Sequence, residues 1–343
     1  SATVVNKQGL IETVQSGISR IDFKDDANGA LLLEPQRTNA IPYSSDFIQW
    51  STRINVTIDS NASISPDGTL NADRITFDGT TNARVETSAQ GINSFEGTKH
   101  RPNSVWLKTE SGTTTVQIGS GSAWLSTVTV TEEWQRFTYI SRQAFARIKS
   151  DNATSVLAWG YQFETNGDVS LSYATSYIPT SGAITTRNQE LCNNATPVIN
   201  SEEGTLYAEI SALSDDLTNR LITISNGTAN NRLILQYNSQ SNNISCNMVV
   251  GGSARGVISY TTAIGLISLN KIAVRYSSTN FDLYVNGVLR DSVGAGSVMV
   301  ANTMNELQFA NYNGTLPFFG NTKGLKYYPK ALADVQLEDL TTI

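Results

Sequence analysis

The chain has 343 residues, a formal net charge of −6 at pH 7 and only 16% charged residues. At about 150 residues per domain, this length predicts two domains, and the abundance of Ser, Thr, Asn and Gly is typical of extracellular or virion β-proteins. Because lysine and arginine form no cluster, the sequence excludes a nucleic-acid binder and disfavours binding to anionic membranes.

Residues 1–38 predict an N-terminal extended arm or hairpin. Apolar residues flank Gly9 on both sides, which indicates a turn between two extended segments. A short buried run at 30–33 ends at Pro35, because proline disfavours the helical conformation for the residue before it. The chain opens with Ser1 and small polar residues rather than with a signal peptide, which we interpret as a cut in a longer polypeptide.

The segment 29–39 reads GALLLEPQRTN, and YSSDF at 43–47 and Trp50 follow it. Together with VNKQGLIE at 5–12, this pattern resembles a motif that recurs in tail-associated structural proteins of bacteriophages and prophages. The resemblance implies a virion tail or extracellular location and a structural or receptor-binding role. It also implies other parts of a larger tail protein as partners and allows for an oligomer.

Residues 39–184 predict an antiparallel β-sandwich, because short alternating segments are separated by polar turns. The strongest turn is SPDGT at 65–69, where Pro and Gly each supply a special backbone geometry. The predicted strands are 73–77, 104–108, 114–118, 127–130, 134–139 and 156–163. Their order, with AWGYQFE at 158–164 and SYIPT at 176–180, resembles a jelly roll of the carbohydrate-binding-module type. The SYIPT ending also recurs in phage tail proteins.

A linker is predicted at 180–183, and residues 185–343 predict a second β-sandwich. Further strands are expected at 204–210, 220–224, 232–237, 245–250 and 256–259. The clearest stretch is 270–292, where apolar residues alternate in a three-stranded meander. Asn286-Gly287 suits a type I′ hairpin turn, so Val288 and Leu289 should fold back beside Tyr284 and Val285. A short helix is predicted at 335–340, with Asp334 as its N-cap.

The meander, the LQFA segment at 307–310, the segment 320–328 and ALAD at 331–334 resemble the back half of a laminin-G-like or concanavalin A-like jelly roll. This resemblance covers about residues 200–343. It implies the fold, which hosts lectins, glycan-degrading enzymes and adhesion modules alike.

The sequence favours a protein without catalytic activity. His100 is the only histidine, and we interpret it as a polar loop residue rather than an acid or base. Glycoside hydrolysis needs two carboxylates at a fixed separation, but the acidic pairs 132–133, 202–203 and 215–216 would point to opposite faces of a strand. We interpret these pairs as solvated turn residues.

Aromatic side chains are the candidate sugar platforms. Trp106, Trp134 and Trp159 lie in alternating strand patterns and are predicted to be core residues. Trp124 follows a Gly-Ser-Ala segment and is the stacking candidate of the first sandwich. In the second sandwich, Tyr312, Phe318 and Phe319 form a loop-borne cluster that is predicted to bind ligand, with packing under the loop as the alternative.

One loop, SDDLTN at 214–219, carries the oxygen ligands that calcium prefers in laminin-G-like domains. The candidate ligands are Asp215, Asp216 and Asn219, although the loop lacks EF-hand spacing. Two cysteines are too few for a four-sulfur zinc site. Pairing of Cys192 with Cys246 and two separate buried thiols both remain open.

The predicted fold class is therefore all-β: two antiparallel sandwiches in series, an N-terminal arm and one short C-terminal helix. The leading functional hypothesis is a non-catalytic module of a phage or prophage tail that binds a polysaccharide or cell-surface glycan. The alternatives are an accessory polysaccharide-binding region of a larger glycan-degrading enzyme and, ranked third, a glycan hydrolase or lyase. No apolar run approaches the ~20 residues that span a membrane, so no membrane insertion is expected.

Overall fold

The computed structural model describes residues 2–91, 99–120, 124–193 and 195–343, and of Trp124 it describes the backbone only. These residues are nearly all β, in several antiparallel sheets with one α-helix near the C-terminus, so the predicted all-β sandwich class is confirmed. No helix in these ranges is long and apolar enough to cross a membrane.

The chain forms two compact units. Unit 1 comprises Ser1–Asn28 and Pro35–Gln189, and unit 2 comprises Gly29–Glu34 and Glu190–Ile343. The predicted arm is therefore grouped with the first sandwich, apart from the segment Gly29–Glu34. The segment that follows residue 184, expected to lead into the second sandwich, pairs within unit 1 as β16 (Thr185–Arg187). That the two units fold independently stays a prediction.

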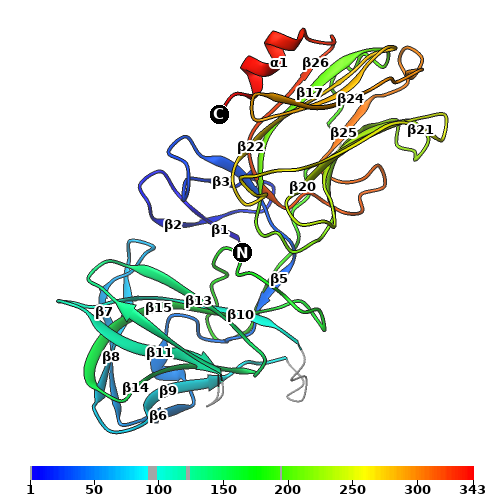
Figure 1. Ribbon diagram of the computed structural model, residues 1–343. Coiled ribbons are helices and arrows are strands. Elements are labelled where there is room, and N and C mark those ends of the chain that lie inside the picture. The colour runs from blue at the N-terminus through cyan, green and yellow to red at the C-terminus, as the bar shows by residue number, and fades with distance from the viewer. Residues whose placement is uncertain (1, 92–98, 121–123, 194) are drawn as a thin grey trace. The chain divides into compact units, whose positions relative to one another are not determined.

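Unit 1 is a sandwich of two antiparallel sheets (Figure 1). Alternate residues of facing strands meet between the sheets, as the period of two along a strand requires, and Val105, Ile118 and Ile148 are fully buried there. One sheet has the order β13 (Gln135–Ser141), β10 (Arg101–Lys108), β15 (Ala153–Thr165), β8 (Leu70–Asp78) and β7 (Val56–Ile64), with β5 (Arg37–Asn39) and β16 continuing from the end of β15. The other has the order β12 (Trp124–Val130), β11 (Thr114–Ser120), β14 (Phe145–Ser150), β9 (Ala83–Ser88) and β6 (Thr52–Ile54), and a short 3₁₀ helix (Phe47–Gln49) precedes β6.

The N-terminal arm is a hairpin of β1 (Ala2–Val5) and β2 (Ile11–Val14), followed by the two-residue strand β3 (Ile21–Asp22). It packs on the outer face of the β10–β15 sheet. The Thr3 hydroxyl donates a hydrogen bond to the Tyr177 carbonyl (2.6 Å), and the Ile11 amide donates one to the Pro66 carbonyl (2.9 Å). Ile11 also packs against the aromatic group beneath it. The predicted hairpin thus has a definite partner surface.

That aromatic group consists of Trp106, Trp159 and Tyr177. The Trp106 and Trp159 rings meet edge to face with centroids 5.4 Å apart, and Tyr177 lies 4.6 Å from Trp159. Strand alternation places Trp106 and Trp159 on the face opposite the core residue Val105. Of the three tryptophans predicted to be core residues, Trp159 is buried, whereas Trp106 and Trp134 are half-buried beside it. The sequence did not show the surface that covers Trp159, which is the arm rather than the second sheet.

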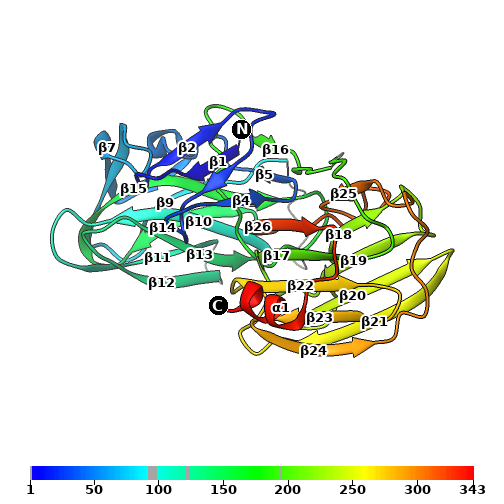
Figure 2. The ribbon, with the colours of Figure 1, turned by 90° about the horizontal axis from the view of Figure 1, so that it is seen from above.

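Unit 2 is also a sandwich, and Figure 2 shows α1 lying over its β22 and β23. One sheet has the order β24 (Val288–Val293), β23 (Phe281–Val285), β22 (Asn270–Tyr276), β17 (Gly204–Ala212), β26 (Gly320–Tyr328) and β4 (Ala30–Leu33). The other has the order β21 (Ser253–Thr261), β20 (Asn243–Val250), β19 (Arg232–Tyr237), β18 (Arg220–Ser225) and β25 (Glu306–Gln308). Apolar side chains of both sheets form one buried core.

The predicted meander is confirmed in detail. Tyr284 pairs with Leu289 and Val285 pairs with Val288. Asn286 and Gly287 have φ angles of 53° and 78°, the positive values that a type I′ turn requires.

The C-terminal helix α1 (Asp334–Thr341) starts one residue earlier than predicted. Its N-cap is Ala333, whose backbone amide donates to the Gln336 side chain (3.0 Å), so the prediction that Asp334 caps the helix is wrong. Asp334 instead lies in the first turn and pairs with Arg275 (2.7 Å). Leu337 of α1 is fully buried against the outer face of the sheet, beside Tyr284.

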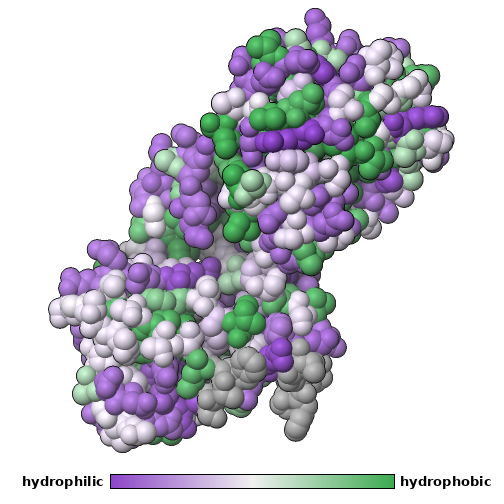
Figure 3. All heavy atoms as spheres, viewed as in Figure 1, coloured by the Kyte–Doolittle hydropathy of each residue, from purple (hydrophilic) through white to green (hydrophobic). Residues whose placement is uncertain are grey.

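Hydrophilic residues are interspersed with smaller apolar groups over the face drawn in Figure 3. Such a mixture is normal for folded proteins, so single exposed apolar residues carry no argument about a site.

Strand β4 belongs to unit 2 although it precedes nearly all of unit 1 in the sequence. It pairs with the start of β26, Leu33 opposite Gly320, and the Leu33 side chain is 5% exposed within the core of unit 2. Unit 2 therefore needs a strand from the N-terminal part of the chain to complete its sheet.

Leu33→Ala should lower the stability of unit 2 by about 2–4 kcal/mol, because it leaves a cavity in that core. All five tryptophans lie before residue 190, so tryptophan fluorescence reports on unit 1 while far-UV circular dichroism reports on both units. We expect Leu33→Ala to lower the stability measured by circular dichroism. The stability measured by tryptophan fluorescence should stay the same.

The control Leu70→Ala, at a side chain that is 60% exposed, should change stability by no more than about 0.5 kcal/mol. An equal shift of the fluorescence and dichroism transitions by Leu33→Ala would contradict the assignment of β4 to unit 2.

Candidate functional site

The predicted stacking residue of the first sandwich, Trp124, is the first residue of β12 and pairs with Ser120 of β11. Its side chain lies outside the described residues, so sugar stacking on Trp124 stays a prediction.

The predicted aromatic cluster of unit 2 separates into two environments. Phe318 is 1% exposed and packs on Tyr237 (5.8 Å between centroids) and on Phe309 (6.2 Å). Its ring offers no open face, so packing under the loop, the alternative considered from the sequence, describes Phe318. Tyr312 and Phe319 are half-buried, and the Arg232 guanidinium lies 5.1 Å from the Tyr312 ring centroid.

Two of the three predicted calcium ligands, Asp215 and Asp216, are engaged by other protein groups, and calcium binding by Asn219 stays a prediction. Asp216 Oδ1 pairs with Arg220 (2.6 Å), a side chain that is only 2% exposed. Asp215 Oδ2 accepts hydrogen bonds from the Ser241 hydroxyl (2.5 Å) and the Asn242 amide (2.9 Å). Nowhere in the described ranges do three or more His, Cys, Asp or Glu side chains gather as a metal site. Arg220 already supplies positive charge where a cation would have to bind.

Added calcium or its removal with a chelator should therefore leave the melting temperature of the chain unchanged. Asp216→Asn should lower the melting temperature in both conditions, because it leaves the buried Arg220 charge without its carboxylate. A rise in melting temperature with calcium that disappears in Asp216→Asn would instead support a calcium site.

The other residues examined for chemistry make local structural contacts. His100 Nε2 lies 2.8 Å from a guanidinium nitrogen of Arg142. Glu132 accepts a hydrogen bond from the Gly112 amide (2.6 Å), and Glu203 accepts one from the Ala331 amide (3.3 Å). Such bonds hold turns and loops in place.

Cys192 and Cys246 are both free thiols. Burial raises the pKa of each thiol above its usual value. A raised pKa favours the protonated thiol over the reactive thiolate at neutral pH.

One cavity of the described residues lies on the outer face of unit 1, along β13. It has a volume of about 760 Å³, and we call it the β13 pocket. The lining residues are Lys24, Pro102, Gln135, Arg136, Thr138, Tyr139, Ile140, Ser172, Tyr173 and Ala174.

Strand pairing explains the floor of the β13 pocket. Three pairs face each other across β10 and β13: Pro102 with Ile140, Ser104 with Thr138, and Trp106 with Arg136. Residues opposite one another in an antiparallel pair share a face, so Arg136, Thr138 and Ile140 all point to the outer side. The pocket floor is therefore a regular strand surface, which holds side chains more precisely than a loop does.

The wall of the β13 pocket is the segment 172–174. It is anchored by Thr175, whose amide and hydroxyl donate to the two carboxylate oxygens of Glu164 (2.7 Å each). Glu164 is fully buried and faces the Arg37 Nε at 3.6 Å. The Arg37 guanidinium also lies 5.4 Å from the Tyr173 ring centroid. The residues EPQRTN at 34–39, recognised in the sequence as a motif, thus position the wall that carries Tyr173.

Tyr139 turns its hydroxyl away from the β13 pocket. The hydroxyl lies 2.6 Å from that of Tyr161 inside the sandwich, and burial raises the pKa of Tyr139 well above its usual value. Neither hydroxyl ionises near neutral pH, so only the Tyr139 ring contributes to the pocket surface.

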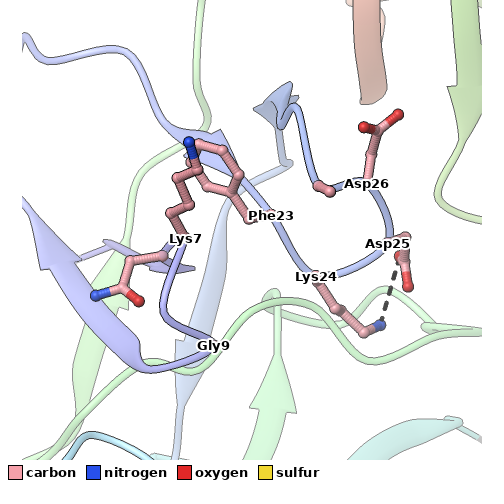
Figure 4. A pocket seen from close by; sticks show the side chains of 8 residues that line it. Lys7, Gly9, Phe23, Lys24, Asp25 and Asp26 are labelled. Carbon is pink, nitrogen blue, oxygen red and sulfur yellow. Dashed lines mark ion pairs between the residues drawn. The ribbon is translucent and has the colours of Figure 1, made fainter.

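A second, smaller cavity of about 380 Å³ lies within the arm. Figure 4 shows its residues, which come from the loop between β1 and β2 and from the loop after β3, with a dashed line for the ion pair of Lys24 and Asp25. Because exposed loop residues of mixed charge line this cavity, it is the weaker candidate. Lys24 lines both cavities.

Sequence reasoning missed the β13 pocket because its lining comes from four separate segments. The alternation around Trp134 predicted the strand, but no sequence signal showed that residues 24 and 172–174 reach the same surface. Composition gave no hint of the pocket either, since its lining contains no carboxylate, histidine or cysteine.

The comparisons with known proteins concern the fold. Residues 179–337 match the family model of the concanavalin A-like lectin/glucanases superfamily. Unit 2 thus has a lectin-like fold. The matched range is a little under half of the chain and includes nearly all of unit 2 except β4.

Solved structures show weaker likeness. The Ruminococcus gnavus IT-sialidase CBM40 is 18% identical, with 41% of this chain and 83% of that chain covered and a TM-score of 0.36. The heptameric SAP-like pentraxin of Limulus polyphemus is 14% identical, with 43% and 72% covered and a TM-score of 0.34. No curated protein matches the sequence significantly.

Trp159→Ala should cost unit 1 about 3–5 kcal/mol of stability, because the indole is 2% exposed among Trp106, Tyr177 and the arm. Its Nε1 has no hydrogen-bond partner among the described residues, so packing alone is lost. Urea unfolding followed by circular dichroism measures the change. An unchanged midpoint would mean that the arm does not cover this ring in solution.

Proposed function

We propose that this chain is a non-catalytic glycan-binding module of a phage or prophage tail. The observation that carries the proposal is the match of residues 179–337 to the concanavalin A-like lectin/glucanases superfamily, a fold that presents glycan-binding surfaces in many proteins. The resemblance of residues 29–50 and 176–180 to tail-protein motifs supports the tail location.

The β13 pocket supports binding rather than catalysis. Its lining combines one tyrosine ring on the wall with the hydroxyl side chains of Thr138 and Ser172. Aromatic rings and a few directed polar groups are what ligand pockets use for affinity and orientation. Glycoside hydrolysis needs two carboxylates, and the lining has none.

We further propose Tyr312 and Phe319 in unit 2, and Trp124 in unit 1, as secondary contacts. Tyr312 and Phe319 are half-buried, so each residue is partly exposed to solvent. These contacts are independent of the β13 pocket, and single substitutions separate them from it.

Binding of the full chain to a glycan array, followed by titration of the best ligands, tests the function. Tyr173→Ala should weaken binding by about fivefold or more, if a sugar ring stacks with somewhat less than the energy of a nucleobase. The melting temperature should change little, because the ring is only half-buried. Comparing the affinity loss in Trp124→Ala and Tyr312→Ala with that in Tyr173→Ala shows which surface contributes most to binding.

Two results would contradict the proposal. Failure of the folded chain to bind any glycan would exclude a binding module. Release of reducing ends or unsaturated products from a polysaccharide, abolished by changing one Asp or Glu, would make the chain an enzyme.

A further inference from the structure

We propose that the β13 pocket recognises an acidic glycan by placing the sugar's negatively charged group between Arg136 and Lys24. This inference rests on the proposed glycan-binding function and adds the chemical class of the ligand. It starts from the charge of the pocket.

The lining of the β13 pocket opposes the charge of the chain as a whole. The chain carries a net charge of −6, yet two of the ten lining residues are cationic and none is acidic. A cleft of one sign with low-dielectric walls concentrates its field and draws in ligands of opposite charge. The pocket therefore selects for anions within an otherwise acidic protein.

Arg136 is held in place by its neighbours. Its guanidinium lies 4.5 Å from the Trp106 ring centroid, and one terminal nitrogen donates to the Ser104 hydroxyl (2.8 Å). Trp106 in turn packs on Trp159 and Tyr177. The Arg136 Nε is buried, so the terminal nitrogens are the groups that donate to a carboxylate or phosphate, and an arginine fork fixed in advance loses little entropy on binding.

Lys24 approaches from another element, the loop after β3. Its side chain is 66% exposed, and its ion pair with Asp25 spans 3.9 Å between two exposed groups. Exposed pairs of this kind contribute little and exchange readily. Lys24 can therefore turn its ammonium group toward an anion in the pocket at small cost.

The remaining lining suits the rest of a sugar. Thr138 and Ser172 supply donors and acceptors for ring hydroxyls, and Tyr173 supplies an aromatic ring. Charge, hydrogen bonding and an aromatic surface thus meet in one cavity. A carboxylate-bearing sugar and a sugar with a phosphate or sulfate group share the chemistry that Arg136 and Lys24 recognise.

The test compares acidic glycans with neutral forms of the same polymers. The probes for the full chain are polygalacturonate and its methyl ester, hyaluronan and its methyl ester, dextran sulfate and dextran, and poly(glycerol phosphate). At low salt we expect at least one acidic probe to bind about tenfold or more tightly than its neutral form, the effect of one charge-assisted hydrogen bond. Affinity should fall as salt rises.

Single substitutions assign the effect to the pocket. Lys24→Gln should weaken binding of the acidic probe severalfold, and by a larger factor than binding of any neutral probe. Lys24→Glu should weaken binding of the acidic probe further. Lys326→Gln, which removes an exposed charge of unit 2, is the matched control and should have no effect. Arg136→Lys keeps the positive charge but removes the planar guanidinium fork. It should therefore weaken binding of the acidic probe with little change in melting temperature.

The outcomes separate this inference from the proposed function. If the chain bound only neutral glycans and Tyr173→Ala reduced that binding, the proposed glycan-binding function would stand. The inference that the ligand is acidic would be overturned. The inference would also be overturned if Lys24→Gln, Lys24→Glu and Arg136→Lys all left the affinity for acidic glycans unchanged. Binding to no glycan at all would overturn both proposals. Preference for carboxylate, sulfate or phosphate probes identifies the anion.

Discussion

The architecture of unit 1 depends on the side-chain amide of Asn39, which is fully buried. Its Nδ2 donates to the carbonyls of Tyr161 (3.2 Å) and Ile178 (2.9 Å), and its Oδ1 accepts from the amides of Ile41 (3.2 Å) and Phe163 (3.1 Å). One side chain thereby joins β5, β15 and the segment that ends the first sandwich. Burying an amide costs free energy unless all of its partners are supplied, so only one arrangement of these three segments satisfies it.

This constraint changes the interpretation of the tail-protein motif. Arg37 and Asn39 of the motif contact buried partners, and Glu164 accepts bonds from the segment that carries Tyr173. The motif therefore supports the fold that forms the pocket wall, and the proposed ligand contacts lie outside it. Motif residues with such a structural role carry no information about the ligand, because function resides in sites that a fold presents and not in the fold itself.

The sequence predicted most strands and the meander correctly because alternation and the Asn286-Gly287 turn are local signals. It could not show where distant segments meet. Trp159 was correctly expected to be buried, but period two does not tell which face of a sheet the arm will cover. The apolar run 30–33 was correctly identified as buried, yet its pairing with β26 depends on residues at the other end of the chain. The β13 pocket, assembled from four segments, was invisible for the same reason.

The position of β4 has a consequence for how such proteins can evolve. Modular proteins diversify when recombination exchanges a whole domain at one boundary, and the natural boundary here would lie after residue 189. A crossover at that point would give unit 2 a foreign N-terminal neighbour and remove the strand whose Leu33 fills its core. The recombined protein would fold only if its new N-terminal domain were preceded by a strand that can replace β4. The lectin-like unit and the sequence before it are therefore constrained to be inherited together.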